Sequence, residues 1–196
     1  MSIINALTAF FIKSDSLANA KAVMLHSPTL TKIMLVITNI GGTVCMVILS
    51  VLAFAFLAYK KRWRHAFFFS LSMAGALVLE LLLKTLAHRQ RPENSLVQTS
   101  GYAFPSGHAT MALVFFSLLI YLFKDDIKKE LWKHVFIISS IFLALLIGFS
   151  RVYLNAHWLT DVIGGFALGL FWLMLMMLVF KMKNSEKPAS EQGKTL

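Results

Sequence analysis

The sequence is poor in charged residues and has almost no cysteine. Only 14% of its 196 residues are charged and 58% are hydrophobic, with a mean hydropathy of +0.71. Soluble domains have about 45–50% apolar residues even when glycine is counted among them. The composition therefore indicates a chain that is solvated by lipid, and its length fits one domain rather than two.

The scarcity of cysteine and the placement of charge exclude further classes of protein. Cys45 is the one cysteine, so the chain cannot form an internal disulfide or a cysteine-rich metal site. The net charge of +10 would suit nucleic acid only if it formed a basic face on a soluble fold. Here the charges lie in short segments between apolar runs, which indicates membrane topology and no nucleic-acid partner.

The sequence does contain long apolar runs. A helix needs roughly 20 apolar residues to span a bilayer. The runs lack the period-2 alternation of a membrane barrel, and hydrocarbon offers the backbone no hydrogen-bond partner outside a helix. We therefore predict an all-α, polytopic transmembrane bundle with five spans at residues 33–59, 66–86, 105–123, 135–153 and 158–180.

The two ends of the chain differ from these runs. Residues 3–12 are apolar but too few to span a bilayer, and no basic segment precedes them as in a signal peptide. We predict that residues 1–30 form an amphipathic segment at the membrane interface, with a sixth, degenerate span as the alternative. Residues 1–183 then make one transmembrane domain, and the polar residues 184–196 form a disordered tail.

Lysine and arginine predict the orientation of the bundle. Segments 60–64, 124–133 and 181–194 hold twelve of the nineteen, and alternating spans place all three on one face. That face, with the C-terminus, should be cytoplasmic, which makes the chain an integral protein of a bacterial cytoplasmic membrane. The outer face receives Lys84, Arg89, Arg91 and Arg151 against the rule, and such an exception needs a functional reason.

Three of these cations are spaced to meet. Lys84 and Arg91 are seven residues apart, so a helix that ends at Arg91, before Pro92, presents both on one face. Arg151 comes from another helix. Arginine binds two phosphate oxygens with its planar fork, and lysine acts as a point charge. Converging cations at a membrane surface indicate an anionic lipid head, although any one of them alone could anchor headgroups.

The tetrapeptide Pro-Ser-Gly-His at residues 105–108 precedes an apolar run. Proline is favoured in the first turn of a helix, so we expect a helix to begin at Pro105. The amides of Ser106, Gly107 and His108 would then form an anion site at the positive helix end. The Ser106 hydroxyl could donate to phosphate and His108 could protonate a leaving oxygen. Alone, the tetrapeptide is equally consistent with a helix cap and an incidental histidine.

His157 and Asp161 are four residues apart, hence on one helix face. A carboxylate behind an imidazole fixes its tautomer and leaves the other nitrogen as a nucleophile or base. The alternative for Asp161 is an acid favoured by the helix dipole. Glu80, inside the second span, is expected to pair with Lys84. A metal would need at least three histidine, cysteine or carboxylate ligands, and the cations here disfavour one.

Together these segments resemble the type 2 phosphatidic acid phosphatase (PAP2) superfamily. Its pattern is Lys-x6-Arg-Pro, then Pro-Ser-Gly-His, then Ser-Arg-x5-His-x3-Asp. Residues 84–92, 105–108 and 150–161 match it in order and with every spacing. Members usually have six spans, whereas five are counted here, and Asn155 stands where many members have glycine.

The resemblance implies a lipid phosphate phosphatase that works through a phosphohistidine without a metal or other cofactor. His157 would attack phosphorus, Asp161 would hold His157, and His108 would protonate the leaving group and then activate water. Ser150 would assist. The equatorial oxygens would be bound by cations and amides of Lys84, Arg91, Ser106, Gly107 and Arg151.

Several functions share these motifs. Phosphatidic acid, phosphatidylglycerol phosphate, undecaprenyl diphosphate and a lipid A phosphate are all candidate substrates. Vanadate-dependent haloperoxidases carry the same motifs, but they are soluble. A lipid phosphotransferase would use the same intermediate, and a lipid-binding or transport protein would keep the site without chemistry. The substrate, which depends on residues 93–104 and on the groove between helices, and the oligomeric state stay open.

Overall fold

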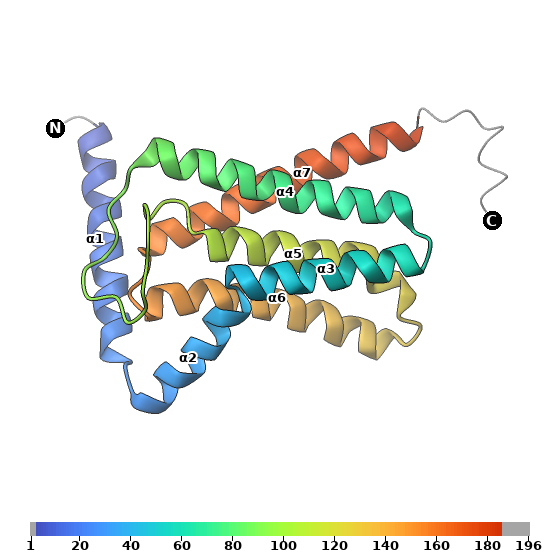
Figure 1. The fold of residues 1–196 in the computed structure, drawn as a ribbon. Helices are drawn as coiled ribbons and strands as arrows, with labels where there is room; N and C mark the ends of the chain where they lie inside the picture. The colour runs from blue at the N-terminus through green and yellow to red at the C-terminus, as the bar shows by residue number, and fades with distance from the viewer. Residues whose placement is uncertain (1–2, 186–196) are drawn as a thin grey trace.

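The structure is a computed structural model that describes residues 3–185. Within that range the chain is all-helical, as predicted, with seven α-helices and a short 3-10 helix, η1 (Figure 1). The predicted disordered tail lies outside the described residues from residue 186 onward, and residues 184 and 185 still belong to the last helix. The elements are α1 (Ile3–Met24), α2 (Pro28–Ile40), α3 (Thr43–Tyr59), α4 (Trp63–Ala87), α5 (Gly107–Phe123), η1 (Lys124–Asp126), α6 (Glu130–Tyr153) and α7 (Leu159–Ser185).

Four helices of the described chain, α4 to α7, are long and apolar enough to cross a membrane. Helices α2 and α3 pass the same test together, as a pair bent by 47°. The five predicted spans are confirmed when this bent pair is taken as one. The chain is therefore an integral membrane protein built on a helical bundle.

The predicted first span, residues 33–59, is wrong in being continuous, because the helix breaks at Gly41 and Gly42. A Cβ atom at Gly41 would lie 2.4 Å from Cγ2 of Ile147 and 3.4 Å from Cδ2 of His108. Only glycine allows so close an approach to α6. The break therefore fits against α6 and brings the end of α2 beside the first turn of α5.

Helix α1 lies across one end of the bundle, while the other long helices run along the length of the bundle (Figure 1). It packs against α6 and α7 and turns Asp15 and Asn19 inward, where both are buried. Phe10 and Phe11 are exposed on the same helix. Among the described helices, α1 is not one of those able to span a membrane. This arrangement fits an interfacial helix, and that placement in the membrane stays a prediction.

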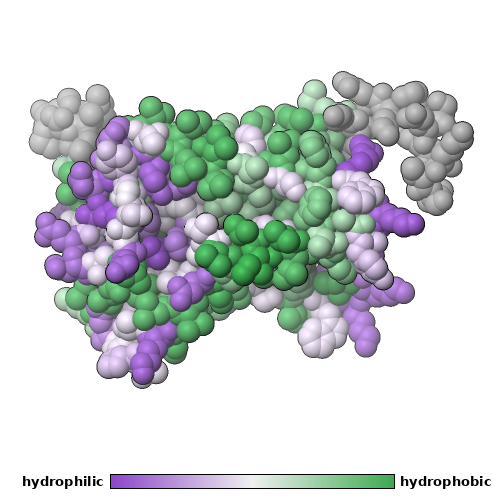
Figure 2. Space-filling view, viewed as in Figure 1, coloured by the Kyte–Doolittle hydropathy of each residue, from purple (hydrophilic) through white to green (hydrophobic). Residues whose placement is uncertain are grey.

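Helix α5 is central and packs against α4, α6 and α7. Its Val114 and Leu118 have no exposed surface, and Phe68 and Phe69 of α4 are buried against the same core. Many large apolar side chains of the bundle face outward instead. Figure 2 shows them as green surface between two more hydrophilic ends. Water would disfavour such a surface, whereas lipid solvates it.

The connections of the bundle divide between its two ends. The α3–α4 and α5–α6 connections and the end of α7 share one end (Figure 1). The basic segments 60–64 and 124–133 therefore lie together, as alternating spans predict. Arg62 donates to Asp126 over 2.7 Å and ties these two connections. The α6–α7 connection and the segment between α4 and α5 lie at the opposite end, beside α1.

Candidate active site

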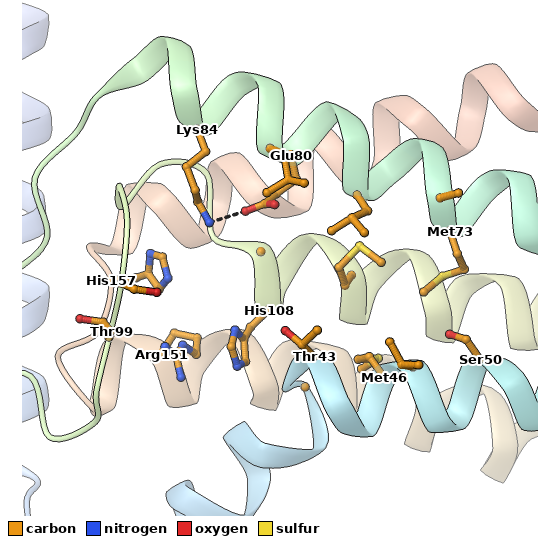
Figure 3. A pocket seen from close by; sticks show the side chains of 18 of the residues that line it. Thr43, Met46, Ser50, Met73, Glu80, Lys84, Thr99, His108, Arg151 and His157 are labelled. Atoms are coloured by element: carbon orange, nitrogen blue, oxygen red, sulfur yellow. Dashed lines mark ion pairs between the residues drawn. The ribbon is translucent and has the colours of Figure 1, made fainter.

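Side chains from four elements converge at the end of the bundle near α1. Lys84 comes from α4, His108 from α5, Arg151 from α6 and His157 from the α6–α7 connection (Figure 3). They line a common pocket. The structure therefore brings together residues that are more than 70 positions apart in the sequence.

Lys84 lies in the last turn of α4, whereas Arg91 lies beyond the helix. The predicted helix through Arg91 is wrong: α4 ends at Ala87, and His88 has φ of +46°. A residue in this left-handed region ends a helix because the chain can no longer continue the ladder of hydrogen bonds. Arg91 reaches the pocket from the irregular segment that follows.

The guanidinium of Arg91 is held by main-chain oxygens. It donates to the carbonyl groups of Ser100, Gly101 and Ala156, each over 2.9 Å. These three bonds join the segment before α5 to the α6–α7 connection. They also fix the fork at the edge of the pocket, so a bound anion would meet a preorganised cation.

The start of α5 differs from the expected one. The helix begins at Gly107, with Ser106 as N-cap, and not at Pro105. The N–H of Ser106 donates to the carbonyl of Asp161 over 3.0 Å, so the expectation that it faces a ligand is wrong. The amides of Gly107 and His108 remain as candidate anion donors at the positive end of the helix.

The end of α6 forms a Schellman motif that explains the spacing between Arg151 and His157. The N–H of Ala156 donates to the carbonyl of Arg151 over 3.0 Å, and that of Asn155 to Val152 over 3.0 Å. Asn155 has φ of +53°, where glycine is favoured and asparagine is tolerated. The reversal of the chain lets both site residues face one pocket.

His157 is held between an acid and a cation. Its Nδ1 atom lies 3.4 Å from Oδ2 of Asp161, and its Nε2 atom accepts a hydrogen bond from Arg91 over 3.1 Å. Arginine has no acceptor, so the Nε2 atom carries a lone pair and the proton sits on Nδ1. Asp161 is fully buried and also accepts from the amide of Trp158 over 2.9 Å. The arrangement aims an unprotonated nitrogen at the pocket.

The environment of His157 keeps its imidazole neutral. Burial is the main cause that lowers the pKa of His157, to about 4, and the charges of Arg91 and Arg151 lower it further. The carboxylate of Asp161 acts in the opposite direction. At neutral pH the ring is therefore neutral, with its proton on Nδ1 and a lone pair on Nε2.

Two polar contacts hold the remaining cations. Lys84 forms an ion pair with Glu80, as the i, i+4 spacing predicts (Figure 3). A Cβ atom at Gly107 would lie 2.8 Å from Oε1 of Glu80, so the missing side chain makes room for this pair. Arg151 is buried and donates to Oγ1 of Thr38 over 2.6 Å.

The pocket has a volume of about 880 Å³ and two different parts. Its polar part is lined by Lys84, Arg91, Gly107, His108, Arg151 and His157, and by Gln98, Thr99 and Ser100. Its apolar part continues between α3 and α4 (Figure 3), where Met46, Val47, Val51, Phe54, Met73, Ala74 and Leu77 line it. A ligand that suits both parts has an anionic head and a long apolar chain.

Three predicted residues lie behind the pocket surface. Asp161 lies behind His157, and its supporting role stays a prediction. Ser106 is fully buried, and its hydroxyl has no protein partner within residues 3–185. Ser150 is also buried, and its hydroxyl donates to the carbonyl of Ile147 over 2.6 Å. The structure therefore does not bring Ser150 into the pocket, which argues against the predicted assisting role.

Sequence reasoning missed Arg89 and Asp15. The charge pattern of the sequence places Arg89 on the outer face and assigns it no partner, but Arg89 donates to Asp161 over 2.6 Å and forms an ion pair with Asp15 of α1. One signal was present: Asp15 is the only acidic residue among residues 1–30. Nothing in the spacing could show its partner, since the two residues are 74 positions apart.

Comparison with known proteins identifies the family. The PAP2 superfamily profile matches residues 65–185, which include every motif segment. A membrane-embedded helical bundle with an anion site beside a histidine–aspartate pair is the class of protein that the fold and the site define. The chain belongs to the PAP2 superfamily and is a phosphatase of that type.

Three relatives illustrate the match. Phosphatidylglycerophosphatase B of Bacillus subtilis is 34% identical over 167 residues, which cover 83% of this chain and 81% of the relative. A lipid A 1-phosphatase of Rhizobium johnstonii is 33% identical over 60% of this chain and 48% of its own. The crystal structure of a transmembrane PAP2-type phosphatidylglycerolphosphate phosphatase from Bacillus subtilis superposes with a TM-score of 0.81, at 30% identity, over 94% of this chain and 90% of that one.

Proposed function

We propose that the protein hydrolyses a lipid phosphate through a phosphohistidine on His157, without a metal ion. One observation carries the proposal: the unprotonated Nε2 atom of His157 faces a cationic pocket that continues into an apolar groove. A phosphate in the cationic part would present its phosphorus to this nitrogen. The acyl or prenyl chain of the same molecule would lie between α3 and α4.

In the first step the Nε2 atom attacks phosphorus and the bond to the leaving oxygen breaks. The imidazole becomes cationic as the N–P bond forms, because Nδ1 keeps its proton. Asp161 stabilises that positive charge and holds the ring in the attacking orientation. The separation of 3.4 Å between Nδ1 and Oδ2 leaves room for this contact to shorten as charge develops.

His108 transfers the protons. It lies in the first turn of α5 and lines the pocket with His157. In the first step it gives a proton to the leaving oxygen, and in the second it takes one from the water that attacks the phosphohistidine. Hydrolysis releases phosphate and returns both histidines to their starting states.

Cations and amides stabilise the phosphoryl group during both steps. Lys84, Arg91 and Arg151 supply positive charge. The amides of Gly107 and His108 supply hydrogen-bond donors at the positive end of α5. The buried hydroxyl of Ser106, which has no protein partner within residues 3–185, is a further candidate donor beside these amides. These groups replace the charge that a metal would bring, so the reaction should not need one.

Phosphatidylglycerol phosphate is the first candidate substrate. Two lines support it: the identity of 34% to phosphatidylglycerophosphatase B and the TM-score of 0.81 to the Bacillus subtilis phosphatase. Phosphatidic acid, undecaprenyl diphosphate and a lipid A phosphate are the alternatives. Since the basic connections lie at the far end, the pocket would open on the extracytoplasmic side of a bacterial cytoplasmic membrane.

The test is phosphate release from these four lipids in detergent by the purified protein. His157→Ala should remove the activity. Its matched control is His134→Ala, an exposed histidine one turn after the start of α6 at Glu130. Phosphate release by His157→Ala at the wild-type rate would refute the assignment. Transfer of phosphate to an added alcohol in place of water would identify a phosphotransferase.

A further inference from the structure

Arg89 joins two buried carboxylates that come from opposite ends of the chain. Its NH1 atom donates to Oδ1 of Asp161 over 2.6 Å, and its NH2 atom forms an ion pair with Asp15 of α1. Asp15 is 1% exposed and Asp161 is not exposed at all. A carboxylate that has lost its water needs a charged or hydrogen-bonding partner. Arg89 supplies a positive charge to both.

Asp15 also fastens α1 to the first turn of α7. Its Oδ1 atom accepts from the amide of Thr160 over 2.9 Å, and its Oδ2 atom accepts from the hydroxyl of Thr160 over 2.7 Å. Thr160 directly precedes Asp161. The network of Asp15, Arg89 and Thr160 therefore lies directly beside Asp161, which pairs with His157.

A second residue of α1 contacts the chain segment that carries His157. Asn19, one helical turn after Asp15, donates to Oδ1 of Asn155 over 2.6 Å and to the carbonyl of His157 over 3.3 Å. Helix α1 thus contacts the turn that carries His157 directly, and it is linked to Asp161 through Arg89.

We propose that Arg89 is a positioning residue for the His157 nucleophile and that Asp15 holds Arg89 in place. The proposal rests on the function proposed above. Arg89 takes one oxygen of Asp161, which leaves the other to face Nδ1 of His157. The guanidinium is a rigid planar fork, so its link to Asp15 fixes the direction from which it holds Asp161. Helix α1 is then part of the catalytic apparatus and more than a membrane attachment.

This role differs from contact with a lipid headgroup. Arg89 does not line the pocket, and its two terminal nitrogens are engaged by Asp15, Thr160 and Asp161. Its loss should slow the chemical step and leave substrate binding unchanged. In kinetic terms kcat falls while KM stays constant.

The experiment measures kcat and KM of Arg89→Gln for the lipid phosphate that the wild type hydrolyses fastest. We expect kcat to fall about tenfold or more, because a small displacement of a nucleophile is costly, with KM within about twofold of wild type. Arg62→Gln is the matched control. Its side chain is 29% exposed, as that of Arg89 is, and it pairs with Asp126 at the other end of the bundle. Both of its constants should stay at wild-type values.

Two further variants test the link to α1. Asp15→Asn keeps a hydrogen-bonding group but removes the charge, so kcat should fall less than in Arg89→Gln. The double variant should be no slower than Arg89→Gln alone, since both changes break the same link. Multiplying effects would show that the two residues act independently and would overturn the role of Asp15. Arg89→Lys, which keeps the charge without the fork, should recover part of kcat.

The outcomes separate this inference from the proposed function. A raised KM at constant kcat in Arg89→Gln would show headgroup contact and overturn the positioning role, as would wild-type kinetics. In either case an inactive His157→Ala leaves the proposed function standing, while an active His157→Ala rejects that function. If Arg89→Gln does not fold, Arg89→Lys and Asp15→Asn give the same kcat and KM comparison.

Discussion

The NH1 atom of Arg91 lies 3.1 Å from the Nε2 atom of His157, on the opposite side of the imidazole from Asp161. The contact does two things. It identifies Nε2 as the unprotonated nitrogen, and it places a cation next to the atom that attacks phosphorus in the proposed mechanism. A phosphate oxygen that accepts from Arg91 would bring the phosphorus within reach of the nucleophile.

The position of Arg91 predicts how activity depends on pH. In the proposed mechanism the neutral imidazole is the nucleophile, so kcat/KM of the free enzyme should fall as pH drops through the pKa of His157, about 4. The charge of Arg91 lowers that pKa. Arg91→Gln should therefore raise it and move the acid limb of the pH profile to higher pH.

The measurement compares pH profiles of the variant and the wild type on one substrate, so that ionisation of the substrate cancels. Arg62→Gln serves as the control and should leave the acid limb in place. An acid limb that moves to lower pH in Arg91→Gln would contradict the geometry around His157.

Asp161→Asn should nearly abolish turnover while the lipid still binds. The neutral asparagine side chain accepts only a weak hydrogen bond from Nδ1 of His157 and has no charge to stabilise the cationic imidazole. We therefore expect kcat to fall on the order of 10³-fold with KM little changed. Asp126→Asn, at the far end of the bundle, is the control. A variant that keeps a tenth or more of wild-type kcat would show that His157 does not depend on Asp161.

Thr38→Val tests the support of Arg151 by α2. The substitution keeps the shape of the side chain but removes the oxygen that accepts from Arg151 over 2.6 Å. A less well held cation should raise KM by roughly tenfold, in line with the loss of one hydrogen bond to a charged group. Thr38→Ser restores the acceptor and should restore KM. Equal KM values for the valine and serine variants would contradict this role.

Ala74→Trp tests the apolar groove. Ala74 lines the groove on α4, so an indole there should obstruct a long acyl chain and reduce kcat/KM for long-chain lipid phosphates by about tenfold or more. A short-chain phosphate ester should react as before. The control is Val78→Trp, one turn further along α4 and outside the groove. Equal losses for long and short chains would place the lipid chain elsewhere.

Much of the fold could be predicted from the sequence because membrane spans depend on local composition. The apolar runs predicted α4 to α7 within a few residues. The break between α2 and α3 could not be predicted, since Gly41 and Gly42 are tolerated in continuous membrane helices. Their role becomes visible only where α6 packs within 2.4 Å of the Cβ position at Gly41.

The candidate site, like the fold, could be predicted from the sequence only in part. Spacing along one helix correctly paired Glu80 with Lys84. His157 and Asp161 also lie close together, but the predicted shared helix is wrong, because His157 precedes α7, which begins at Leu159. Spacing failed where a helix ended early, as at His88, because one residue in the left-handed region redirects the chain. It also failed for Arg89, whose partner lies on a distant helix, and periodicity carries no information about contacts of that kind.

The most direct test of the central claim is a rapid-quench experiment on the His108→Ala variant with radiolabelled nitrophenyl phosphate. Nitrophenolate leaves without a proton donor, so the first step should proceed while hydrolysis of the intermediate, which needs His108, is slow. We predict a burst of nitrophenolate matched by label on the peptide that contains His157. A burst without label on that peptide, or with label on another residue, would contradict the assignment of His157 as the nucleophile.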